Sequence, residues 1–282
     1  MRSALALVAC LFFLAASSTT KPTLDQQCRD VARSWQPRFV DEHMTSTVSL
    51  PFIVAGDGGE ARVRRYLNNT ILAATDAMQR KFFDRAKPQQ PIVILLFESD
   101  EPYRRLAKKW FGDEDVSHFG YFRHDNVMLM NVGTGTGTLV HELTHALIRP
   151  DFPNVPSWFN EGLGSLFEQC TLADGDIRGL VNWRLPDLQR AIKRNELRSV
   201  EGLLKDNDFY GQELVGINYA QARYLLMYLQ ETGKLQRYYK LFRQTRDEDP
   251  TGLKQLKQII APRSLEDFES KWRKWVLLQR FE

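Results

Sequence analysis

The first half of the chain alternates between segments with a strand-like hydrophobic pattern and segments with a helical one. Residues 45–55 are rich in β-branched side chains and end at Gly-Asp-Gly-Gly, so we predict a strand followed by a turn. Apolar residues recur at helical spacing in 60–84, and 91–97 is a continuous apolar run with the length of a buried strand. Residues 119–132 have the composition of strands, with a hairpin-like break at Arg-His-Asp-Asn.

The second half has helical periodicity almost throughout. Several of its segments open with Ser, Thr, Asp or Asn and close at Gly or Pro, as capped helices do, and the polar stretch 171–179 is expected to be a loop. Strands followed by helices indicate an α+β fold, with a mixed sheet-and-helix part at 46–137 and a mainly helical part at 138–282. Residues 19–45 form a polar N-terminal segment with one short helix near 24–34.

The first 18 residues have the layout of a signal peptide. Arg2 precedes an apolar run at 4–16, which small polar residues follow. The run is shorter than the roughly 20 apolar residues that a membrane span needs, and no second long apolar run follows. We therefore expect an exported protein, secreted or periplasmic, whose mature chain has no stable membrane span.

The charge pattern argues against a nucleic-acid partner. The 282 residues carry a formal net charge of only +3, and no basic block alternates with aromatic residues. We therefore expect no nucleic-acid binding.

The cysteines point to a disulfide rather than to redox chemistry. Of the three, Cys10 falls within the predicted signal peptide, which leaves Cys28 and Cys170. Two cysteines in an oxidising compartment favour a disulfide between them. No C-x-x-C motif is present, so we expect neither a redox motif nor a cysteine-based zinc site.

The stretch T-L-V-H-E-L-T-H-A-L, residues 138–147, carries the main chemical signal. In a helix, His141 and His145 lie on one face, because residues four apart are neighbours there. Together with Glu142 they form the H-E-x-x-H motif of zinc metallopeptidases. The alternative is a core helix that carries two histidines with ordinary hydrogen-bond partners.

A third zinc ligand follows sixteen residues after His145. Catalytic zinc usually takes three protein ligands and leaves a fourth position open. Glu161, in P-S-W-F-N-E-G-L-G-S-L-F-E, lies on a second predicted helix, and three prolines between the helices turn the chain back. The aromatic and aliphatic neighbours of Glu161 indicate a buried helix, in which a carboxylate needs a partner.

The chain resembles the gluzincin zinc metallopeptidases through H-E-L-T-H and the downstream W-F-N-E-G. The resemblance covers 138–168 and is closest to the zinc aminopeptidase branch and to peptidase-MA-like proteins. It implies that His141, His145 and Glu161 bind one zinc ion and that Glu142 is the general base. It also implies a gluzincin-like fold, with zinc-binding helices after the mixed sheet part, and a metallopeptidase domain at 46–282.

The sequence departs from the aminopeptidases at one functional segment. Their G-x-M-E-N segment holds the free amine of the substrate, whereas Asn-Val-Gly-Thr-Gly-Thr stands before the motif helix here, without such a glutamate. An endopeptidase that acts on peptide or protein substrates therefore fits better than an aminopeptidase. The segment 120–130 is the expected edge strand for an extended peptide.

The resemblance also implies a tyrosine that stabilises the oxyanion. We expect Tyr219 in this role, although its helical pattern equally suits a core aromatic. Asn160 and Glu168 are expected to support the metal ligands. The alternatives to Tyr219 are Tyr224, Tyr210 and His118.

A non-catalytic binding protein that retains the fold and the metal is the competing hypothesis. Such a scaffold needs the metal ligands but has no need of Glu142. The intact motif therefore favours the enzyme.

Overall fold

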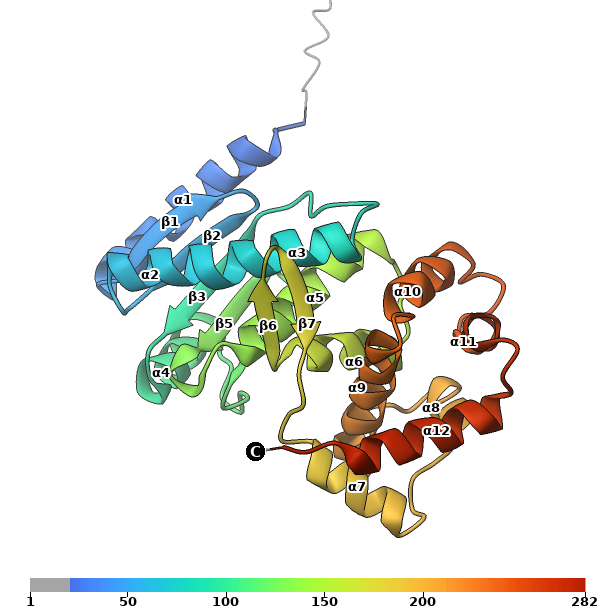
Figure 1. The fold of residues 1–282 in the computed structure, drawn as a ribbon. Coiled ribbons are helices and arrows are strands. Elements are labelled where there is room, and N and C mark those ends of the chain that lie inside the picture. Colours follow the sequence, from blue (N-terminus) through green and yellow to red (C-terminus); the bar gives the residue numbers. More distant parts are fainter. Residues whose placement is uncertain (1–20, 212, 282) are drawn as a thin grey trace, which may run out of the picture.

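A mixed five-stranded sheet forms the centre of the N-terminal half of the chain (Figure 1). The computed structural model describes residues 21–211 and 213–281, so the predicted signal peptide lies outside the described residues. In spatial order the strands are β1 (Thr45–Ser49), β2 (Phe52–Gly56), β3 (Ile92–Phe97), β5 (Val127–Asn131) and β4 (Gly120–Phe122). The three central strands are parallel, and the edge strands β1 and β4 are antiparallel to their neighbours.

Helices cover both faces of this sheet, so every residue of its three central strands is buried. Successive strand residues point to opposite faces, so Ile53 and Leu129 belong to one hydrophobic cluster and Val54 and Met130 to the other. The first cluster packs against α1 (Leu24–Asp41) and α4 (Asp100–Phe111). The second packs against α2 (Glu60–Tyr66), the π-helical turn η1 (Leu67–Leu72), α3 (Ala73–Lys81) and α5 (Gly137–Asp151).

The C-terminal half is helical and is organised around one buried helix, α9 (Val215–Glu231). Helix α6 (Ser157–Phe167) packs closely against it at Gly162, where an added Cβ would lie 3.1 Å from the Cβ of Ala222. The other helices lie to one side of the sheet in Figure 1. They are α7 (Leu185–Lys193), α8 (Val200–Leu204), α10 (Leu235–Gln244), α11 (Leu253–Ile260) and α12 (Leu265–Leu278).

The predicted α+β order of sheet and helices is confirmed, but two segments differ from the prediction. Residues 45–55 form two antiparallel strands, β1 and β2, which meet at a tight turn before Phe52. Residues 171–179, predicted to be a loop, belong to a hairpin of β6 (Cys170–Ala173) and β7 (Asp176–Gly179). Asp174 and Gly175 form its turn with positive φ angles of 52° and 72°, as a two-residue hairpin loop requires.

The predicted short helix near 24–34 extends to Asp41 and contains Pro37. Trp35 and Phe39 are buried against the sheet, so tertiary packing stabilises a helix past the predicted end. None of the helices in the described part of the chain has the length and apolar character that a membrane span requires.

The expected disulfide between Cys28 and Cys170 is not formed: both residues are free thiols in the structure. Cys28 is buried on α1, in the cluster on one face of the sheet. Cys170 packs against the cluster on the opposite face. The sheet therefore separates the two thiols.

Candidate metal centre

Helices α5 and α6 carry the residues that the sequence singled out, and they pack side by side (Figure 1). α5 bears His141, Glu142 and His145, and α6 bears Glu161. The glycine-threonine stretch allows their close approach, because an added Cβ at Gly137 would overlap the carbonyl oxygen of Glu168.

The structure brings the side chains of His141, His145 and Glu161 together. One ligand atom from each lies within 4.8 Å of the other two. Oε2 of Glu161 is 3.2 Å from Nε2 of His141 and 3.4 Å from Nε2 of His145. Among the described residues this is the one such group of three potential ligands, and it could hold a metal ion.

The two imidazole rings are oriented for metal binding. Nδ1 of His141 lies 3.1 Å from Oε1 of Glu168, and Nδ1 of His145 lies 3.1 Å from Oδ1 of Asn160. Both partners can accept the Nδ1 proton of their ring, which leaves each Nε2 facing Glu161. Two imidazole nitrogens and one carboxylate oxygen form a donor set that fits a metal ion.

Two further residues complete the cluster, and the sequence analysis did not identify either of them. Arg184 donates two hydrogen bonds to Glu168, at 2.9 and 3.2 Å, and so neutralises the carboxylate that orients His141. Gly164 leaves room for the ring of His141, because an added Cβ would lie 2.9 Å from its Nε2. Gly164 is visible in the N-E-G-L-G motif, whereas no spacing signal marks Arg184.

The cluster is strongly coupled electrostatically. Burial alone would lower the pKa of His141, but hydrogen bonds with Glu161 and Glu168 outweigh it and raise the pKa to about 10. Burial would raise the pKa of both carboxyl groups, yet their hydrogen bonds to histidine lower it, to about 2 for Glu168. Without a metal, the cluster therefore holds a proton that a bound cation would replace.

Glu142 lines a cavity next to the metal ligands. Burial raises the pKa of its carboxyl group, and the neighbouring histidines oppose this shift. The cavity has a volume of about 240 Å³. Its lining includes Phe122, Glu142, His145, Arg149 and Asn160.

A larger cavity, of about 630 Å³, lies beside the opposite end of the cluster. Glu168 and Arg184 line it together with the glycine-threonine stretch and the exposed aromatic residues Phe119 and Trp183. Trp183 is 56% exposed, and the guanidinium of Arg184 lies 4.1 Å from the centre of its ring system. The cluster therefore has open space on both sides.

Two tyrosines lie close to Glu161. The hydroxyl group of Tyr210 donates a hydrogen bond of 2.7 Å to Oε1 of Glu161. Burial and the negative charge of Glu161 raise the pKa of Tyr219, whose ring packs 5.3 Å from that of Phe209. The structure thus brings both Tyr219 and its alternative Tyr210 to the cluster.

The other two alternatives to Tyr219, which are Tyr224 and His118, form hydrogen bonds with other residues. Tyr224 is fully buried in the core and donates its hydroxyl to the carbonyl oxygen of Asn182. His118 is an exposed residue whose Nδ1 lies 3.1 Å from Asp100. Neither side chain forms a hydrogen bond or an ion pair with His141, His145 or Glu161.

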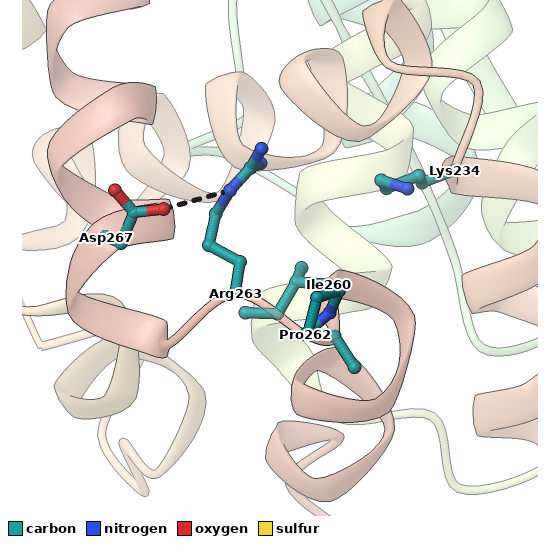
Figure 2. A pocket seen from close by; sticks show the side chains of 6 residues that line it. Lys234, Ile260, Pro262, Arg263 and Asp267 are labelled. Carbon is teal, nitrogen blue, oxygen red and sulfur yellow. Dashed lines mark ion pairs between the residues drawn. The ribbon is translucent and has the colours of Figure 1, made fainter.

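A separate cavity, of about 350 Å³, lies among the C-terminal helices (Figure 2). Lys234 faces it from the segment between α9 and α10, and Arg263 and Asp267 form an ion pair of 3.0 Å on its other side. Because Asp267 is paired and no histidine or cysteine lines this cavity, it offers no second metal centre.

Comparison with known proteins finds no family model and no curated protein that matches this chain.

Proposed function

We propose that this chain is an exported, zinc-dependent metallopeptidase of gluzincin type. The observation that carries the proposal is the convergence of His141, His145 and Glu161 beside a cavity that Glu142 lines. Two neutral imidazoles and one carboxylate form a ligand set of hydrolytic zinc sites. Export rests on the N-terminal sequence pattern alone.

The residues divide the chemistry between them. When bound by His141, His145 and Glu161, zinc supplies Lewis acidity that polarises a carbonyl group and makes water more acidic. Glu142 accepts a proton from the attacking water molecule and passes it to the nitrogen of the leaving amine. Its raised pKa suits it for both proton transfers.

A tyrosine hydroxyl would stabilise the negative charge that develops on the substrate oxygen. We assign this role to Tyr219, because it is held on the buried helix α9, which packs against α6. Tyr210 already donates to Glu161, so its proposed role is to orient that ligand. Loss of one such oxyanion donor typically costs about 3–4 kcal/mol of transition-state stabilisation.

The substrate would be an extended peptide that lies along β4. This strand is the edge of the sheet, and its register leaves the backbone groups of Gly120 and Phe122 on the free side. Phe119 lines the larger cavity and Phe122 the smaller one, so there is open space beside both ends of β4. A chain that extends both ways from the metal is typical of an endopeptidase substrate.

The experiment combines metal analysis of the purified mature chain with cleavage of a mixed peptide library. We expect about one zinc per chain, loss of cleavage with a chelator, and recovery when zinc is restored. His141→Ala/His145→Ala should lose the metal, whereas His124→Ala, in the exposed turn before β5, should retain it. Stoichiometric zinc in the double variant would contradict the ligand assignment.

Peptides with blocked and free N-termini separate the two peptidase classes. We expect similar cleavage of both, because the amine-holding segment of the aminopeptidases is missing. Cleavage confined to free N-termini would instead support an aminopeptidase.

A further inference from the structure

Arg149 is a cationic residue next to the metal cluster that the proposed mechanism does not use. It lies on α5 one helical turn after His145, on the same face of the helix. Its side chain is exposed and lines the 240 Å³ cavity together with Glu142, His145 and Asn160. A group bound at Arg149 would therefore lie in the same cavity as the proposed general base Glu142.

The structure holds the Arg149 guanidinium in place without neutralising it. The group stacks 5.0 Å from the centre of the Phe122 ring, and Nη1 makes one long hydrogen bond, 3.4 Å, to Oδ1 of Asn126. Among the described residues no carboxylate forms an ion pair with it. A guanidinium has five N–H donors, so most of them remain free for a ligand.

The contrast with Arg184 supports a binding role for Arg149. Arg184 lines the cavity on the other side of the cluster, but its charge is matched by the bidentate contact with Glu168. Of the two arginines that flank the cluster, only Arg149 has a positive charge that is available to a substrate. A free guanidinium binds a carboxylate with two parallel hydrogen bonds better than any other common group in a peptide.

We propose that Arg149 binds the side-chain carboxylate of an Asp or Glu in the substrate, on the amino-terminal side of the bond that is cleaved. This inference rests on the proposed peptidase function. It names the class of peptide that the active site prefers.

The direction follows from the edge strand. β4 runs from Gly120, which follows Phe119 at the larger cavity, to Phe122, beside Arg149. An extended peptide pairs slightly more stably in the antiparallel sense, which places its amino-terminal part at Phe122. One helical turn corresponds to about 5–6 Å and an extended residue to about 3.3 Å, so the acidic residue lies one or two positions before the scissile bond.

The test uses peptides that carry Glu, Gln or Lys at one of these two positions and are otherwise identical. Relative kcat/KM is measured for the zinc-loaded protein, and binding of the same peptides is measured with the Glu142→Gln protein. At one of the two positions, we expect kcat/KM of the wild-type protein to be about tenfold higher for the Glu peptide than for the Gln peptide. Added salt should reduce this preference. Arg149→Ala should lose it, and Arg149→Glu should reverse it in favour of Lys peptides.

Arg65→Ala is the matched control. Arg65 is also exposed, stacks 5.8 Å from a tyrosine ring and forms no ion pair among the described residues, but it lies on α2, which packs against β1 and β2 at the other edge of the sheet. Its replacement should leave the Glu-to-Gln ratio unchanged.

Equal ratios for wild type and Arg149→Ala would overturn the inference. So would a preference that appears only for acidic residues or a free carboxylate after the scissile bond. Absence of any zinc-dependent cleavage would instead contradict the proposed function, while the binding ratios of the Glu142→Gln protein would still decide the role of Arg149.

Discussion

Gly164 tests the geometry of the metal centre, because it lies directly against the ring of His141. A Cβ at this position would be 2.9 Å from Nε2, whereas ordinary van der Waals contact begins at 3.4 Å. Gly164→Ala must therefore displace the ring by the difference, about 0.5 Å. The ring cannot move freely, because Glu161 and Glu168 hold its two nitrogens.

A displacement of this size exceeds the tolerance of a metal site, in which ligand distances stay within about 0.2 Å of their ideal values. We expect Gly164→Ala to weaken zinc binding by about 10–100-fold, comparable to the loss of a partner that orients a metal ligand. The affinity is measured by competition with a chromophoric chelator. Circular dichroism and thermal unfolding of the metal-free protein show whether the fold is retained.

Gly216→Ala is the control, because an added Cβ on this residue of α9 meets nothing within 4 Å. It makes the same chemical change within a helix and should leave zinc affinity unaltered. A folded Gly164→Ala protein that binds zinc as tightly as the wild type would refute the placement of the His141 ring.

Three further predictions address catalysis and stability. Glu142→Gln retains all three metal ligands but removes the proton acceptor, so kcat should fall by about 10²–10⁴-fold at unchanged zinc content; unchanged activity would refute the mechanism. Tyr219→Phe should lower kcat by about 10²–10³-fold with little change in zinc affinity, whereas Tyr210→Phe should mainly weaken zinc retention, and the reverse pattern would exchange their roles. Hydrogen bonds from Lys109, and then from Arg105, lower the pKa of Glu42, whose side chain is 11% exposed. The contribution of these contacts to stability is therefore present above about pH 4.3, the usual pKa of an unfolded glutamate, and is lost as the pH falls through the folded-state pKa. Glu42→Gln should thus reduce the free energy of unfolding by about 1 kcal/mol at neutral pH and by much less near about pH 2, as measured by denaturant titration. The same difference between wild type and variant at both pH values would contradict a stabilising role of these ion pairs.

The part of the site that was predictable from the sequence is the part that local geometry determines. His141 and His145 need only a helix to share a face, and Glu161 needs only a second buried helix that returns to the first. Arg184 is different, since its contact with Glu168 depends on how the chain returns after the β6–β7 hairpin. The sequence does not mark Arg149 either, because its proposed binding role depends on the cavity between β4 and α5.

The errors in the fold also have physical causes. Residues 45–55 have a strand-like composition throughout, so the sequence does not mark the turn between β1 and β2 that the pairing of Ser49 with Phe52 shows. The β6–β7 hairpin was missed because its strands are short and mostly polar on one side, although Asp174-Gly175 is a strong hairpin signal. Pro37 suggests an early helix end, yet the aromatic contacts of α1 with the sheet maintain the helix through it.

Glu142 also bears on the choice between an enzyme and a metal-binding scaffold. Burial of its carboxyl group raises its pKa, and the positive charges of His141 and His145 oppose this shift only in part. A carboxyl group desolvated in this way reduces stability unless a partner compensates it. A structural metal site gains nothing from such a residue, and a glutamine or an apolar side chain would suit the fold better. In an enzyme, the same environment helps Glu142 to take a proton from water and pass it to the leaving amine, because a raised pKa makes its carboxylate a stronger base. Catalysis is therefore the hypothesis that accounts for a glutamate at this position.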